Sequence, residues 1–218
     1  MKPDAASELV TAYLRVNDYF VLNDLELHLW EDSVYRAVTD VDIVAVRHRS
    51  PSGPVHYRDT PGVVECGLAG EVDPVLEVAT DRCDVIIGEV KRGEAGYNRS
   101  LRDPRVIHGV FRRVGDVFGA PVDDAIDELV ATGRVLTPWA HVRLVAFGRS
   151  GNVARGMALS HAHVIDWLSA VISRHRELFE VSSFSDPVLS LLALMSRVER
   201  PSGMASLSAK RYKRKERP

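Results

Sequence analysis

The segment Cys83-Asp84-Val85-Ile86-Ile87-Gly88-Glu89-Val90-Lys91-Arg92-Gly93 joins an apolar run to a carboxylate and an amine. The apolar run predicts a buried strand. Because side chains alternate between the two faces of a strand, Glu89 and Lys91 share one face at its end. A buried strand that presents an acid and a base together indicates a functional site.

A second stretch upstream has the same character. In Thr39-Asp40-Val41-Asp42-Ile43-Val44-Ala45-Val46, Asp40 and Asp42 share one strand face and apolar residues follow them. If the two strands are neighbours in a sheet, Asp42 meets Glu89 and Lys91. Asp40 remains an alternative to Asp42 as the acidic group.

The three residue types suit one kind of chemistry. Asp42 and Glu89 are carboxylates, whose hard oxygen atoms are ligands for Mg²⁺. An amine such as Lys91 can orient or deprotonate a water molecule, or pair with a phosphate. Together these groups suit metal-assisted hydrolysis, in which an ion neutralises charge and activates water. The structural alternative is an ion pair between Glu89 and Lys91 near solvent, which would contribute about 1 kcal/mol or less.

The rest of the chain predicts alternating helices and strands. The apolar spacing predicts a helix over residues 5–16, with Glu8 at the edge of its apolar stripe, either solvated or part of the site. Residues 47–80 are rich in Pro and Gly, which predicts a long loop, either a flap over the substrate or an insertion. Further strands are expected in 19–22, 25–29 and 140–147, and further helices in 106–118, 122–131, 161–179 and 187–198.

An acidic residue at the start of an apolar strand, followed by Glu-x-Lys at the end of another, resembles the restriction-endonuclease-like, PD-(D/E)xK, nuclease superfamily. The resemblance covers about residues 5–150 in layout, with the Glu8 helix ahead of the two strands. The matching residues are Asp42, Glu89, Val90 and Lys91.

This resemblance implies an α/β fold with a mixed central sheet flanked by helices, followed here by a helical C-terminal extension. It also implies a Mg²⁺-dependent nuclease that acts on DNA, with Mn²⁺ as an alternative metal. Asp42, Glu89 and the backbone carbonyl of Val90 would hold the metal. Lys91 would act on the attacking water or the phosphate, and Glu8 would complete the catalytic set.

Length and composition indicate one soluble globular domain. The chain has 218 residues, of which 45% are hydrophobic and 27% charged. We expect a domain over residues 1–200, with a core at about 5–150 and the helical extension at about 158–200. No apolar run approaches the roughly 20 residues that span a bilayer, and the N-terminus does not resemble a signal peptide, so a cytoplasmic protein is expected.

The charges are unevenly distributed. Residues 197–218 contain eight Lys or Arg against two Glu, or +6, so the formal net charge of −2 leaves −8 on the remainder. Residues 201–218 lack apolar periodicity and are expected to be disordered. This tail is interpreted either as a solubilising segment or as a weak, sequence-independent contact with the phosphate backbone of DNA.

Two alternatives to a nuclease remain. The first is a non-catalytic module of the same fold that binds nucleic acid or protein, because an acidic body repels DNA. The second is an assembly protein: the helix predicted for 187–198 is apolar almost all round and needs cover from the core or from the second subunit of a homodimer.

Overall fold

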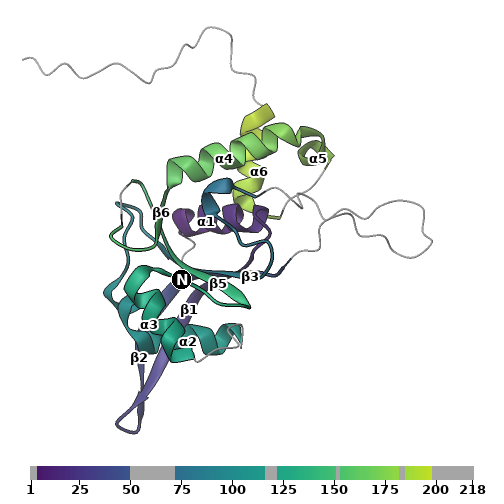
Figure 1. The fold of residues 1–218 in the computed structure, drawn as a ribbon. Coiled ribbons are helices and arrows are strands. Elements are labelled where there is room, and N and C mark those ends of the chain that lie inside the picture. Colours follow the sequence, from purple (N-terminus) through teal and green to yellow (C-terminus); the bar gives the residue numbers. More distant parts are fainter. Residues whose placement is uncertain (1–3, 50–71, 116–121, 151–152, 182–184, 198–218) are drawn as a thin grey trace, which may run out of the picture.

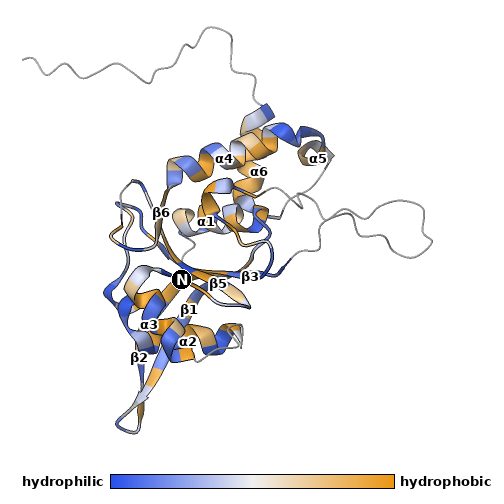
Figure 2. Ribbon diagram, in the orientation of Figure 1, coloured by the Kyte–Doolittle hydropathy of each residue, from blue (hydrophilic) through white to orange (hydrophobic). Residues whose placement is uncertain are grey.

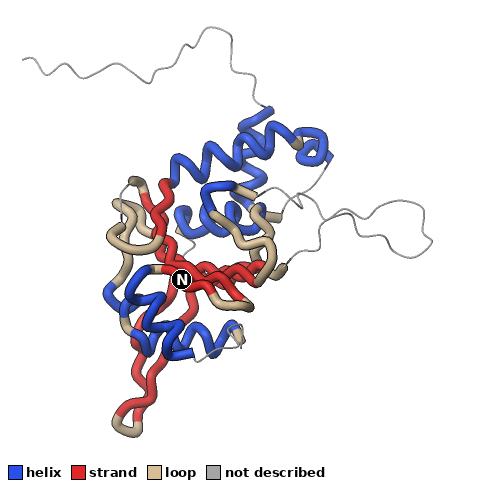
Figure 3. Tube along the Cα trace, in the orientation of Figure 1, coloured by secondary structure: helices blue, strands red, loops and turns tan. Residues whose placement is uncertain are grey.

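The computed structural model describes residues 4–49, 72–115, 122–150, 153–181 and 185–197. Within these ranges the chain forms a mixed six-stranded sheet with helices on both faces, so the predicted α/β class is confirmed (Figures 1 and 3). The strands are β1 (Phe20–Glu31), β2 (Val34–Arg47), β3 (Cys83–Val90), β4 (Arg134–Leu136), β5 (Ala140–Gly148) and β6 (Met157–Ser160).

The sheet has the order β1-β2-β3-β5-β4, and β6 pairs with β5. The pairs β1–β2, β2–β3 and β4–β5 are antiparallel, whereas β3–β5 and β5–β6 are parallel. β2 pairs with β3 only between Ile43 and Arg47, so the first part of β2 pairs with β1 alone. The hairpin of β1 and β2 therefore extends beyond the rest of the sheet (Figure 1).

Two groups of helices cover the sheet (Figures 1 and 3). α1 (Ala5–Val16), α4 (His161–Arg174) and α6 (Pro187–Arg197) lie on one face, and α2 (Pro104–Val114) and α3 (Val122–Thr132) lie on the other. The remaining helical segments are α5 (Arg176–Val181) and two short 3₁₀ turns, η1 (Pro74–Leu76) and η2 (Arg99–Arg102).

β3 lies in the middle of the core, because buried apolar side chains pack against both of its faces. Ile86 and Val90 pack with α1 and α4, and Val85 and Ile87 pack with α2 and α3. A strand buried on both faces reads as a continuous apolar run rather than an alternating one. The burial of β3 on both faces therefore explains why its sequence is a continuous apolar run.

Local capping explains where several helices begin. The carboxylates of Asp4 and Asp103 and the hydroxyl of Ser160 accept N–H hydrogen bonds at the starts of α1, α2 and α4. Pro104, at the first position of α2, needs no N–H partner there, so α2 begins two residues before the predicted start. Gly115, at φ 98°, ends α2 four residues before the predicted end.

Other boundaries also differ from those predicted. The helix expected over 161–179 is divided at His175 into α4 and α5, and the strands expected at 19–22 and 25–29 form the single strand β1. β4 and β6 were not predicted, because three or four residues are too short to show a periodic pattern.

The C-terminal helices cover one face of the sheet. α4 and α6 pack against α1, and Val164 and Leu168 of α4 share a core cluster with Ile43 of β2 and Ile86 of β3. No helix among the described residues is both long and apolar enough to cross a membrane. The tail at 201–218, most of the predicted 47–80 loop and Val198 lie outside the described residues.

Candidate functional site

β2 and β3 bring Asp42 and Glu89 to one place. The last pair of the antiparallel β2–β3 ladder is Ile43 with Gly88, so Asp42 and Glu89 face each other one residue further on. Side chains alternate between the two faces along β3, so Glu89 and Lys91 lie on the same face as Val85 and Ile87. This face is covered by α2 and α3.

Side-chain contacts continue where the ladder ends. The Val90 N–H donates to Oδ2 of Asp42 across 2.7 Å. The Lys91 ammonium donates to Oε1 of Glu89 and, across 2.8 Å, to Oδ1 of Asn98. The Glu89 side chain is 0% exposed and that of Lys91 is 36% exposed. The site therefore has a buried acid behind a base that reaches solvent.

The two oxygens of the Glu89 carboxylate differ in their contacts. None of the residues that the structure describes donates a hydrogen bond to its buried Oε2, although the Asn98 backbone N–H lies near enough to the carboxyl to lower its pKa. Burial raises the pKa of the Glu89 carboxyl, and the Lys91 hydrogen bond opposes this effect while the charge of Asp42 adds to it. Burial also raises the pKa of Asp42, against the hydrogen bond from Val90. A cation between the two carboxylates would lower the energetic cost of keeping both of them ionised in this buried place.

Two more acids surround this pair. Asp24 lies directly across β1 from Asp42, between the pairs Asn23 with Ile43 and Leu25 with Val41, and its φ is 51°. The charges of Asp24 and Asp4 both contribute to the raised pKa of Asp42.

The site and its surroundings are acidic overall. The Asp4 carboxylate accepts a hydrogen bond from the Arg92 side chain across 3.1 Å. The four acids Asp4, Asp24, Asp42 and Glu89 exceed the two bases Lys91 and Arg92, which leaves a formal charge of −2. This local charge favours a cationic ligand.

The structure brings together Asp42, Glu89, Val90 and Lys91 but not the other two predicted residues. Asp40 is exposed and pairs with Glu26 in the hairpin, so Asp42 and not Asp40 lies against β3. Glu8 lies in the first turn of α1 and makes no side-chain hydrogen bond or ion pair with the described residues. Glu8 thus has no link to the site in this part of the chain.

The site offers two carboxylates, which is few for most metal ions but common for Mg²⁺. Among the residues that the structure describes, no three His, Cys, Asp or Glu side chains are grouped to hold a metal ion. Mg²⁺ is commonly held by only one or two carboxylates, with waters and substrate oxygens completing its octahedron. Asp42 and Glu89 supply this number, and Oε2 of Glu89 could bind an ion because no described residue bonds to it.

Asn98 is a site residue that the sequence did not predict. It occupies the N-cap position of η2, yet its side chain makes no capping hydrogen bond and instead accepts from Lys91. Asn at an N-cap ordinarily bonds a backbone N–H of its own helix. Its polar type and its position in the loop after Lys91 were visible in the sequence, but its partner depends on how that loop folds back.

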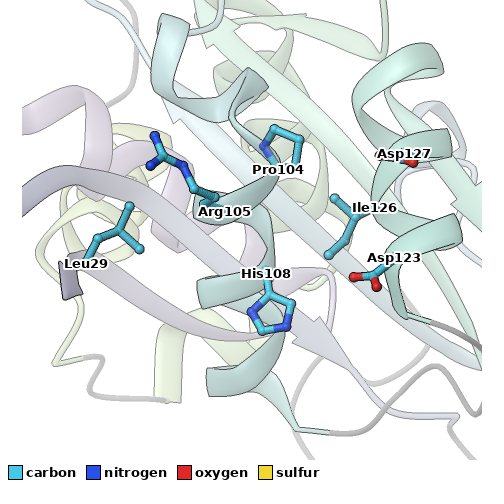
Figure 4. Close-up of a pocket in the computed structure, with 7 residues that line it drawn as sticks. All are labelled: Leu29, Pro104, Arg105, His108, Asp123, Ile126 and Asp127. Carbon is cyan, nitrogen blue, oxygen red and sulfur yellow. The ribbon is translucent and has the colours of Figure 1, made fainter. Parts of the chain in front are cut away.

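A separate pocket of about 440 Å³ lies between the β1–β2 hairpin, α2 and α3 (Figure 4). Leu29 and Ile126 provide apolar surface, and His108, Asp123 and Asp127 provide exposed polar groups. None of the residues that line it belongs to the set around Glu89 and Lys91. The pocket is therefore distinct from the candidate site.

Comparison of the chain with known protein families, curated proteins and solved structures identified no similar protein. The function has to be inferred from the chemistry of the site, because a fold class alone is compatible with many activities.

Proposed function

We propose that this chain is a Mg²⁺-dependent nuclease of the restriction-endonuclease-like, PD-(D/E)xK, type that hydrolyses phosphodiester bonds in DNA. The observation that carries the proposal is the buried Oε2 of Glu89, which has no hydrogen-bond partner in the described part of the chain and lies opposite Asp42 and beside Lys91. Buried polar atoms without a partner call for an explanation, which can be a bound ion. Four other buried side-chain atoms in the described residues also lack a partner, but they belong to Arg47, Arg143 and His161, and Oε2 of Glu89 is the one carboxylate oxygen among them.

Asp42 and Glu89 would hold the ion, with the backbone carbonyl of Val90 as the third protein ligand that the family resemblance implies. A bound Mg²⁺ or Mn²⁺ would neutralise charge on the phosphate and on the oxygen that leaves. It would also relieve the cost of two carboxylates in a site where burial already raises the pKa of both.

Lys91 is the residue suited to act on the reacting groups. Its ammonium is fixed by Glu89 and Asn98 while the side chain remains 36% exposed, so it can contact a substrate from solvent. From that position Lys91 would orient the attacking water or pair with the phosphate. Glu8 and Asp40 are left out of the proposed catalytic set, because Glu8 makes no side-chain hydrogen bond or ion pair with the described residues and Asp40 is exposed opposite Glu26.

DNA is the proposed substrate and partner. The site and its surroundings carry a formal charge of −2, which repels a polyanion unless a cation is bound. Cleavage should therefore depend on a divalent metal. The basic residues of 201–218 offer a second, sequence-independent attraction to phosphate.

The direct test is incubation of the full chain with plasmid DNA in Mg²⁺, in Mn²⁺ and in a chelator. We expect cleavage only with metal, and its loss in Glu89→Gln, which keeps the shape of the side chain but removes its charge. Asp40→Asn is the matched control, because Asp40 lies two residues from Asp42 on the same strand but is exposed. Intact plasmid with the parent protein at all metal concentrations would contradict the proposal.

The main rival is a non-catalytic module of the same class. The ion pair between Lys91 and Glu89 favours it, because the pair partly satisfies the buried carboxylate without a metal. Gel-shift measurements beside the cleavage assay separate the two functions: DNA that is bound but stays intact in Mg²⁺ and Mn²⁺ indicates the binding module.

An assembly role is the second rival. Leu191, Leu194 and Met195 of α6 are 56%, 59% and 58% exposed, and their spacing puts them on one side of the helix. Figure 2 shows that much of α6 is hydrophobic. Sedimentation over a range of concentrations would detect a homodimer. Loss of the dimer in Leu191→Glu, with cleavage unchanged, would show that assembly and catalysis are separate.

A further inference from the structure

Lys91 has two acceptors of different charge. Oε1 of Glu89 is part of a carboxylate, and Oδ1 of Asn98, at 2.8 Å, is part of a neutral amide. In the proposed function Glu89 is also a metal ligand. A divalent cation on Oε2 would share the Glu89 carboxylate with Lys91 on Oε1, and its charge would weaken that carboxylate as an acceptor and repel the ammonium. A neutral amide outside the ligand set is affected much less.

The loop that carries Asn98 is anchored to the neighbouring strands. The Ala95 N–H donates to the Ser150 carbonyl across 2.9 Å, and the Arg149 N–H donates to the Gly93 carbonyl across 2.6 Å. The Tyr97 hydroxyl donates to the carbonyls of Leu144 and Met157. These contacts hold the Asn98 loop through residues other than Glu89, and the Asn98 backbone N–H also lies near the Glu89 carboxyl and lowers its pKa.

We infer that Asn98 is a positioning residue that retains Lys91 at the site when a divalent cation takes the Glu89 carboxylate. The inference rests on the proposed function, because it requires that cation. A lysine side chain has four rotatable bonds, and Lys91 already reaches solvent. Without a second acceptor it would turn toward water once Glu89 is occupied. With Asn98 it stays beside the reacting groups.

The Asn98 side chain does not cap η2, and this supports the proposed role. Asn98 stands at the start of η2 but gives its side-chain oxygen to Lys91 instead of to the turn. Positions where a local structural rule is broken are often functional. Since no capping bond is lost, Asn98→Ala should leave the fold intact.

The test compares Asn98→Ala with Asn98→Asp, which keeps an acceptor oxygen, and with Ser100→Ala. Ser100 lies in the same turn and bonds the Thr39 hydroxyl across 2.9 Å, so its variant controls for damage to η2. The readouts are Mg²⁺ affinity by calorimetry, mobility of the Lys91 side chain by nuclear magnetic resonance with and without Mg²⁺, and the kinetics of DNA cleavage.

We expect Asn98→Ala to bind Mg²⁺ normally but to show a mobile Lys91 side chain only when Mg²⁺ is present. Its kcat should fall at least tenfold with KM unchanged, and Ser100→Ala should behave like the parent. Asn98→Asp should keep the Lys91 side chain ordered in Mg²⁺ but bind Mg²⁺ more tightly than the parent, because it adds a carboxylate beside the ligands. An ordered Lys91 side chain in Mg²⁺-bound Asn98→Ala would overturn the inference alone. Absence of Mg²⁺ binding by the parent protein would overturn the proposed function and this inference with it.

Discussion

Glu89 and Lys91 form an ion pair in which the carboxylate is fully buried and only the amine reaches solvent. The sequence predicted a pair near solvent that contributes about 1 kcal/mol or less. For Glu89 that prediction is wrong, because β3 is covered on both faces up to its end. Loss of Lys91 would leave a buried charge with no partner, which costs more than loss of an exposed pair.

Lys91→Ala should therefore be destabilised by roughly 1–3 kcal/mol in the absence of metal, because the buried carboxylate loses its charged donor. Mg²⁺ should restore much of this loss by taking the place of the ammonium. Cleavage should still fall by about a hundredfold or more, the scale of a positioned proton-transfer group. Urea unfolding with and without Mg²⁺, beside a cleavage assay, measures both effects, and cleavage at the parent rate would refute the assigned role.

Mg²⁺ should stabilise the parent protein through Asp42 and Glu89. A ligand at a hundred times its Kd that binds only the folded state contributes about 2.7 kcal/mol. For a chain of this length 1 kcal/mol raises Tm by about 2–4 °C. Thermal unfolding should show this rise in the parent and in Asp40→Asn but not in Glu89→Gln. Equal rises in all three would place the metal elsewhere.

Acid stability should depend on Asp84, which is fully buried at the other end of β3. Burial would raise the pKa of Asp84, but hydrogen bonds from His141 and Tyr19 and the charge of Arg143 outweigh it, so the pKa lies below its ordinary value. The ionised carboxylate then stabilises the fold above the unfolded pKa of about 3.9, and this stability is lost as pH falls through the folded pKa.

Tyr19→Phe tests this dependence, because the Tyr19 hydroxyl donates to Asp84 across 2.7 Å. Without that donor the folded pKa of Asp84 moves back toward its unfolded value. We expect a loss of about 1 kcal/mol at pH 7. The loss should become smaller as the pH falls below the unfolded pKa of Asp84 toward its lower folded pKa. Urea unfolding between pH 3 and 7 provides the measurement, and an equal loss at every pH would contradict the explanation.

Gly148→Ala should disturb the loop that carries Asn98. A Cβ at Gly148 would lie 2.6 Å from Cα of Ala95 and 2.8 Å from the Gly93 carbonyl oxygen, and backbone atoms cannot move aside easily. Overpacking of this kind costs about 1–3 kcal/mol. Gly96→Ala is the control within the same loop, since its Cβ would meet nothing within 4 Å. Thermal unfolding should separate the two variants, and similar Tm values would refute the predicted clash.

Deletion of residues 201–218 should weaken DNA binding and reduce its dependence on salt. The deletion removes six Lys or Arg and one Glu. The shortened chain would neutralise fewer phosphates, so fewer counterions would be released when it binds DNA. Metal-dependent cleavage should persist, because Asp42, Glu89 and Lys91 are untouched. Binding measured over a range of salt concentrations checks this, and an unchanged slope would leave the tail a solubilising segment.

Local patterns in the sequence were sufficient to predict several elements. The apolar run before Glu89 predicted β3, the stripe after Asp4 predicted α1, and period two predicted that Glu89 and Lys91 share a face. These features depend on residues a few positions apart, so a single sequence contains them. Their boundaries shifted where a residue such as Pro104 or Gly115 set the end of a helix.

The meeting of distant residues, in contrast, depended on the folded chain. The β2–β3 register placed Asp42, and not Asp40, against β3, and the helices over both faces buried Glu89 completely. The folded-back loop directed Asn98 to Lys91 instead of to its own turn. Cross-strand register and burial arise from packing between residues far apart in the chain, and many such arrangements satisfy the same local patterns.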